Sequence, residues 1–432
     1  MTGGRGFELR RHPVVAVVWV LASLFAIFQL GRLASFMIDP ARTYGSALPG
    51  EFTVHHSCFS AYFEAARLLP DVPNIYDPRV YMIPGTTDYR SIGPFELDEF
   101  LYPPPFLLLP RLALRASRNF FVLRGAWFAF ELTFLIVALA GIARFAGPIG
   151  RRAMLIGPGV LAALPTLITL QFGNFQLAAI CAAMLAMVAF ESGLVLLGAS
   201  VLAFVTWAKI FPGILLIHLA MARRWRAIGW TAAFGAFYFA LALWCFGRAP
   251  FAAFFTYELP RIGSGEAFQF LTVDAASAAI NDSVGGLVLK LRALGVPGAT
   301  RGAAAFVSWV FTAVVVGAAC LRAPSTRLER SQFWLALLVL ASFRSPFAPQ
   351  EYALFAPIWL CTLVAAGAPL SARAWIPLTL AWLVLNAVFP YDGPVQGKAL
   401  IFVATVPQVV ALALAAHVVF RSRRQAIATP AT

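Results

Sequence analysis

The sequence predicts an all-α fold, a polytopic integral membrane bundle with about twelve membrane segments. The chain has 432 residues, of which 60% are hydrophobic and 12% charged, whereas soluble domains are about 45–50% apolar and about 25% charged. A water-soluble or disordered chain of this composition is excluded, because it would expose large apolar patches. The apolar residues also form unbroken blocks such as 14–30, which is typical of spanning helices and not of alternating β-barrel strands.

A spanning helix needs about 20 apolar residues. The first apolar block follows a basic N-terminus and is too long for the core of a cleaved signal peptide, so we expect a retained helix. Twelve stretches are expected to form membrane segments: 13–37, 119–145, 153–171, 174–191, 193–209, 210–222, 227–247, 302–321, 330–345, 351–369, 374–390 and 398–420.

The positions of the basic residues predict the topology. An even number of segments places both termini on one side, and that side collects the arginine clusters, which marks it as cytoplasmic. The net charge of +14 is then explained by this rule and by contact with anionic lipids rather than by nucleic acid. The clusters are Arg5/Arg10/Arg11, Arg144/Arg151/Arg152, Arg223/Arg224/Arg226, Arg322/Arg327/Arg330, Arg373 and Arg421/Arg423/Arg424.

Two long loops lie on the opposite side of a single domain, 1–432. The first runs over 38–118 and the second over 248–301, and together they hold most of the 19 acidic residues. Acidic residues contribute little to orientation. We therefore expect the chemistry of this protein to lie outside the cytoplasm.

Two places interrupt the regular pattern. If the chain turns at Lys209, the returning segment 210–222 spans only about 20 Å, so the turn lies below the outer surface, against protein or a water-filled cavity. The alternative is one long tilted helix with Lys209 reaching the interface. The second place is 101–118, where three prolines precede arginines at 111, 115 and 118, which indicates an amphipathic or re-entrant helix at the outer interface.

Polar residues at the outer ends of helices are candidates for a binding site. Lys209 and Arg344 are placed to neutralise a phosphate, Lys209 as a point charge and Arg344 as a bidentate donor. A transferase that releases a lipid phosphate needs that neutralisation and a base for the acceptor hydroxyl. The amides that share this side are Asn174, Gln176 and Asn281. No residues have the spacing of metal ligands, and no nucleotide-binding or hydrolase motif is present.

Several short motifs in this order resemble glycosyltransferase family 87, the polyprenyl-phosphate-mannose-dependent mannosyltransferases of the GT-C superfamily. They are Phe59-Ser60-Ala61-Tyr62-Phe63-Glu64-Ala65-Ala66, Asn74-Ile75-Tyr76-Asp77, Leu101-Tyr102-Pro103-Pro104-Pro105-Phe106, Gly173-Asn174-Phe175-Gln176, Lys209-Ile210-Phe211-Pro212 with Arg223-Arg224-Trp225-Arg226, Asn281-Asp282-Ser283 and Arg344-Ser345-Pro346.

The resemblance implies a GT-C-like fold with a large first extracytoplasmic loop and an interfacial helix, in the plasma membrane of a bacterium. It implies transfer of a hexose, mannose in this family, from a polyprenyl phosphate to a lipid or glycan acceptor, usually with inversion. It leaves dependence on a divalent metal open. The family's base is an aspartate a few residues before the tyrosine that matches Tyr62, and here Cys58 stands at that position.

A thiol is a poor replacement for a carboxylate base, so another residue is expected to take the role. The acidic pair Asp98 and Glu99 is the first candidate, followed by His56 and Glu64. Two other functions stay open. One is a lipid-linked sugar transporter or flippase, because broken helices also occur in transporters. The other is a catalytically silent relative, which the cysteine at position 58 motivates.

Overall fold

The computed structural model describes residues 13–69, 71–148, 150–321, 324–369, 371–389 and 393–428. The predicted cytoplasmic residues Arg5, Arg10, Arg11 and Arg322 lie outside these ranges, and the side chains of Arg151, Arg423 and Arg424 are not described. The described chain is a helical bundle with one two-stranded sheet. The predicted all-α membrane fold is confirmed.

Every one of the twelve predicted segments holds helix. The helices are α1 (Pro13–Ile38), α5 (Phe120–Phe145), α6 (Gly150–Leu161) with α7 (Leu164–Phe172), α8 (Gln176–Glu191), α9 (Val195–Lys209), α10 (Ile214–Met221), α11 (Trp225–Phe246), α16 (Arg301–Ala319), α17 (Arg327–Ser342), α18 (Gln350–Ala353) with α19 (Phe355–Gly367), α20 (Ala372–Leu385) and α21 (Gly397–Ala428).

Fewer of these helices have the length of a full span. Within the described residues, five helices are long and apolar enough to cross a membrane, namely α1, α5, α11, α16 and α21. The pair α6 and α7, bent by 51°, makes a sixth if it is one span. The bend follows from the sequence, because Pro165 cannot continue a helix and the Leu164 N–H instead donates to Asn386 Oδ1 at 2.7 Å.

Burial separates lipid-facing from central helices. Large apolar side chains of α1 and α11, such as Leu21 and Trp244, are exposed, as expected for surfaces that contact lipid. By contrast, α8, α17 and α19 are buried over most of their length. These three form the centre of the bundle.

The chain turns after Lys209, as predicted. Helix α9 ends at that residue, a 3₁₀ turn follows at Phe211–Gly213, and α10 returns. Ile210 has a φ of 57°, a conformation that is unfavourable for a β-branched residue and marks a sharp break rather than a continuous tilted helix. The break brings the end of α9 against the 3₁₀ turn Pro104–Leu107.

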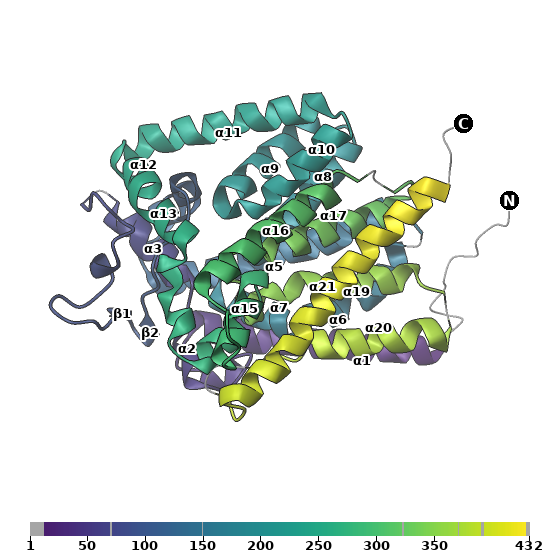
Figure 1. Ribbon diagram of the computed structural model, residues 1–432, viewed down its shortest axis with the longest axis horizontal. Coiled ribbons are helices and arrows are strands. Elements are labelled where there is room, and N and C mark those ends of the chain that lie inside the picture. The colour runs from purple at the N-terminus through teal and green to yellow at the C-terminus, as the bar shows by residue number, and fades with distance from the viewer. Residues whose placement is uncertain are drawn as a thin grey trace.

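The elements of the two long loops gather at one end of the bundle, opposite the end where α1 begins and α21 finishes (Figure 1). The first loop holds 3₁₀ turns at Thr43–Gly45, Pro78–Val80 and Pro104–Leu107, α2 (Glu51–His55), α3 (Phe59–Leu68), β1 (Ser91–Ile92), β2 (Phe95–Glu96) and α4 (Leu108–Ala116). The second holds α12 (Ala249–Ala253), a π turn (Phe254–Glu258), α13 (Leu259–Ser264), a 3₁₀ stretch (Glu266–Thr272), α14 (Ala275–Ala279) and α15 (Val284–Ala293).

The helix predicted after the three prolines is α4. It packs on α3, and Arg111 donates to the Ala66 carbonyl at 2.9 Å. Strands β1 and β2 pair antiparallel, with Ile92 opposite Phe95. This hairpin leads the chain directly into the acidic segment that begins at Glu96.

Candidate active site

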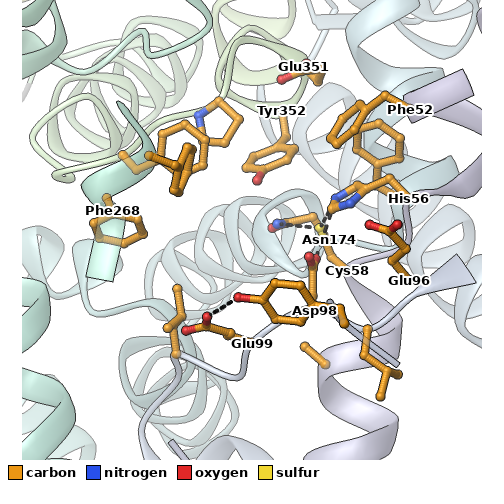
Figure 2. A pocket seen from close by; sticks show the side chains of 18 of the residues that line it. Phe52, His56, Cys58, Glu96, Asp98, Glu99, Asn174, Phe268, Glu351 and Tyr352 are labelled. Atoms are coloured by element: carbon orange, nitrogen blue, oxygen red, sulfur yellow. Dashed lines mark hydrogen bonds and ion pairs between the residues drawn. The ribbon is translucent and has the colours of Figure 1, made fainter. Parts of the chain in front are cut away.

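A cavity of about 740 Å³ opens at the loop end of the bundle. The first loop lines it with the α2–α3 region, Tyr89 and the segment 96–102, and the second loop with its 3₁₀ stretch and with Ser277 and Ile280. The turn between α7 and α8 and residues 347–352 complete the lining. Figure 2 shows polar side chains from the first loop on one wall, with Phe268 and Tyr352 facing them. Charged and aromatic groups in one enclosed space suit a polar ligand that carries a ring.

The junction between α2 and α3 directs two side chains into the cavity. Helix α2 ends at His55, His56 is extended, and Cys58 precedes the first turn of α3. The His56 ring stacks on Phe52 with centroids 4.8 Å apart and meets the edge of Phe172 at 4.6 Å. These aromatic contacts fix the orientation of the imidazole.

His56, Cys58 and Asp98 meet at one point of the wall (Figure 2). His56 Nε2 lies 3.4 Å from Cys58 Sγ and 3.5 Å from Asp98 Oδ2. Asn174 Nδ2, from the turn between α7 and α8, donates to the same sulfur at 3.4 Å. One ligand atom of each of the three residues lies within 4.8 Å of the others, and this is the one such group found among the described residues.

The surroundings of Cys58 and Asp98 favour their protonated forms. Burial, together with the nearby Asp98 carboxylate, raises the pKa of the Cys58 thiol. Burial likewise raises the pKa of Asp98, against the lowering effect of His56. A protonated thiol neither attacks carbon nor accepts a proton well, so Cys58 alone does not replace a carboxylate base.

Asp98 and Glu99 are held by different partners. The Asp98 N–H donates to Ser60 Oγ at 3.0 Å, and that hydroxyl donates to the Glu96 carbonyl. Tyr89 donates to Glu99 at 2.5 Å, and Arg261 of the second loop lies 3.9 Å from the other Glu99 oxygen. Both carboxylates line the cavity, as the acidic-pair prediction requires.

Lys209 reaches the cavity wall through a tyrosine. Its Nζ donates to Tyr102 Oη at 2.9 Å and lies 4.5 Å from the centre of that ring. The Tyr102 and Tyr62 hydroxyls are 2.8 Å apart, and the Phe175 N–H donates to Tyr62 Oη. Burial raises the pKa of Tyr102, so this tyrosine remains a neutral donor beside a cation. Tyr62 and Tyr102 both line the cavity.

Glu64, a predicted base candidate, lies elsewhere. Arg67 binds both of its oxygens at 2.7 and 2.8 Å, and Arg90 donates to Oε1 at 2.8 Å. Burial raises the pKa of Glu64, but the two arginines outweigh it and hold the pKa below its usual range. Glu64 does not line the cavity, and its contacts suit a role in holding the first loop together.

Three other predicted residues make structural contacts away from the cavity surface. Arg344 donates to Thr312 Oγ1 at 2.9 Å. Asn281 connects its own loop to Pro346 and Ala348 through its side-chain amide. Gln176 donates to the Tyr352 carbonyl at 3.4 Å. None of these three residues lines the cavity, and of the three amides only Asn174 does.

The structure also adds residues that the sequence reasoning missed. Glu351 and Tyr352 line the wall opposite Asp98, with Phe268 beside them. The sequence signal for them is a carboxylate and a tyrosine two and three residues after Pro349, at the expected outer start of a membrane segment. Cys58 was noted only as a departure from the family pattern, whereas it is part of the polar cluster.

These features define a class of protein: a helical membrane protein with an open cavity at one end, lined by carboxylates and aromatic side chains. The sequence model of glycosyltransferase family 87 matches residues 100–349, more than half of the chain. The chain belongs to this family and is a membrane glycosyltransferase by family. Comparison with curated proteins gave no match. Tyr102, Asn174 and Lys209 lie inside the matched range, whereas His56, Cys58, Asp98 and Glu99 precede it.

Proposed function

We propose that this protein transfers a hexose from a polyprenyl phosphate to a lipid or glycan acceptor bound in the cavity, and that this hexose is mannose. The observation that supports this most strongly is that Asp98 and Glu99 line the same cavity as Tyr102, which is hydrogen-bonded to Lys209. A glycosyltransferase needs both a proton acceptor and a stabiliser of the leaving phosphate.

The transfer is a single displacement. The acceptor hydroxyl oxygen forms a bond to the anomeric carbon while the bond from that carbon to the phosphate oxygen breaks. The electron pair of the broken bond leaves with the polyprenyl phosphate, and the hydroxyl proton passes to a carboxylate of the pair Asp98 and Glu99. No nucleotide takes part, which fits the absence of nucleotide-binding motifs from the sequence.

The donor phosphate is proposed to lie beside Tyr102. That hydroxyl is neutral and polarised by the Lys209 ammonium at 2.9 Å, so it can donate to a developing negative charge. The turn after α9 leaves Lys209 partly buried, where its charge acts with less screening than at a surface. The polyprenyl chain then extends along the apolar helices into the membrane.

The proposed orientation follows the positive-inside rule. It places both termini in the cytoplasm of a bacterial cell and the cavity outside, in the plasma membrane. The two long loops with their acidic residues then face the compartment in which lipid-linked sugars are consumed without nucleotides. In a cysteine-labelling test, a reagent that does not cross membranes is expected to reach a cysteine introduced at Asp88 in intact cells.

The activity is tested with the purified protein in detergent, radiolabelled polyprenyl-phosphate-mannose and a membrane extract as the acceptor source. We expect labelled product that does not form when the donor is replaced by a nucleotide sugar. A transporter would instead move the labelled lipid across proteoliposomes without covalent product. A silent relative would give neither result, and product formed only from the nucleotide sugar would contradict the proposed donor.

A further inference from the structure

Two of the three separations among His56, Cys58 and Asp98 are those of ligands that share one small cation. A tetrahedral zinc site has Zn–S distances near 2.3 Å and Zn–N and Zn–O distances near 2.0–2.2 Å, which place neighbouring ligand atoms about 3.4–3.6 Å apart. Here His56 Nε2 is 3.4 Å from the sulfur and 3.5 Å from the Asp98 oxygen. The separation between the sulfur and the Asp98 oxygen is within 4.8 Å, so binding an ion would draw these two atoms to tetrahedral spacing.

The groups around these three side chains are those expected of an outer shell. Residues that orient metal ligands are hydrogen-bonded or packed against them and strongly affect affinity. Asn174 donates to the sulfur, which favours its thiolate form, and Ser60 fixes the backbone of Asp98. Phe52 stacks on the imidazole of His56. Each of the three ligands is therefore held from a different direction.

The fourth position of the tetrahedron faces the cavity, because all three residues line it. Three protein ligands with one open position is the arrangement of a catalytic site, whereas structural zinc sites are closed by a fourth side chain. A thiolate and an imidazole select zinc over magnesium or calcium, which prefer oxygen ligands. The donor set thus indicates both the ion and its accessibility to a ligand.

We propose that His56, Cys58 and Asp98 bind a divalent zinc ion whose open position receives the acceptor hydroxyl. The role of the hydroxyl rests on the proposed function, whereas the binding of the ion does not. A coordinated hydroxyl loses its proton more readily, and Glu99, which lines the same cavity and is not a ligand, takes that proton. The bond changes at the anomeric carbon and at the leaving phosphate stay as stated above.

This assignment explains what the cysteine at position 58 does. A lone buried thiol contributes little as a base, but as a thiolate ligand it anchors a Lewis acid at the place where an acceptor hydroxyl must be activated. The ion also compensates for the negative charge of the thiolate and the Asp98 carboxylate in an enclosed space, where two uncompensated anions would repel.

Cobalt(II) is a spectroscopic probe for such a site. The purified full-length protein is stripped with a chelator, titrated with cobalt chloride, and examined for the near-ultraviolet charge-transfer absorption of a cobalt–thiolate bond. We expect an equimolar saturating band in the wild type that zinc chloride abolishes by displacement. Absence of the band in folded wild-type protein overturns the proposal.

Variants locate the ion. Cys58→Ser is expected to lose the charge-transfer band, and His56→Gln and Asp98→Asn to weaken cobalt affinity at least tenfold. Asn174→Ala, which leaves all three ligands in place, should weaken it by about 10–100-fold. Cys245→Ser and His55→Gln are matched controls that should keep the wild-type band, because Cys245 is exposed and His55 lies outside the three-residue cluster. A band that persists in Cys58→Ser contradicts the assignment.

The two proposals fail in different ways. Cobalt binding without glycosyl transfer would support the metal site and contradict the proposed function. Undiminished transfer by metal-free protein would leave the proposed function in place and contradict the role of the zinc ion in activating the acceptor hydroxyl. Size-exclusion chromatography of each variant in the same detergent shows whether a lost signal reflects misfolding.

Discussion

Glu64 and Asp98 are two carboxylates of the same predicted loop with opposite surroundings. Both oxygens of Glu64 are occupied by Arg67 and Arg90, and its side chain is 2% exposed. Asp98 faces the cavity beside His56, with a side chain that is 36% exposed. The comparison teaches that the partners of a carboxylate, rather than its place in a motif, decide whether it holds the loop or remains available to a ligand.

The largest expected effect on transfer is that of Asp98→Asn. This change removes a negative charge that transfer needs, as proton acceptor of the acidic pair or as ligand of the proposed zinc ion, and should lower the rate of transfer by about 10²–10⁴-fold. Asp88→Asn, an exposed acid of the same loop, is the matched control and should transfer normally. Initial rates with saturating labelled donor measure both, and equal rates in the two variants would remove Asp98 from the mechanism.

Lys209→Met should have the next largest effect. It removes the cation that polarises Tyr102 while keeping the length of the side chain, and the loss of one stabilising donor costs about 10²–10³-fold in rate. The effect should appear in kcat more than in KM, because the charge on the leaving phosphate develops in the transition state. A change confined to KM would make Lys209 a ground-state binding residue.

Arg344→Met tests whether the second predicted phosphate ligand takes part. Because its guanidinium contacts Thr312 and Trp309 rather than the cavity, we expect transfer to fall less than tenfold. The same assay serves, with the Lys209→Met protein as reference. Equal losses of activity in the two variants would support the prediction from sequence that Lys209 and Arg344 bind one phosphate.

Glu64→Gln should affect transfer least and stability most. Leaving two arginines without a carboxylate costs about 1–3 kcal/mol at neutral pH. Since the pKa of Glu64 is below its ordinary value of 4.5, the stabilisation is present above that pH and is lost as the pH falls through the lower folded-state value. In detergent, the unfolding temperature of the variant should therefore be lower than that of the wild type at pH 7, and the difference should disappear at acidic pH. A difference in unfolding temperature that increases at acidic pH would contradict this expectation.

Much of the architecture could be predicted from the sequence. Apolar blocks located the helices, the end of α9 at Lys209 followed from the residues Lys209-Ile210-Phe211-Pro212, and the prolines before α4 placed its start. Spanning length could not be predicted as well, since α8, with 16 residues, reaches only about 24 Å. Helix lengths are set by where neighbouring helices pack and where the turns close.

The candidate site was predictable only in part. Asn174 follows from the expectation that polar groups at the outer ends of segments share one space, whereas Tyr62 and the base candidates Asp98, Glu99 and His56 follow from the family resemblance, and all five line the cavity. The contact between Cys58 and Asp98 could not be foreseen, because 39 residues of loop separate them and their approach depends on Ser60 and the β1–β2 hairpin. The sequence pattern also does not fix the lateral positions of α9 and α17, so it could not show that Lys209 contacts Tyr102 whereas Arg344 contacts Thr312 and Trp309.

In the proposed mechanism the donor sugar lies in the cavity between Asp98 and Tyr102. Its position is tested by photocrosslinking of the purified protein with a polyprenyl phosphate whose sugar carries a photoreactive group, followed by peptide mapping. We expect modification within 96–106 and 172–176, suppressed by unlabelled polyprenyl-phosphate-mannose. Suppressible modification confined to the opposite end of the bundle, around 223–226, would contradict it.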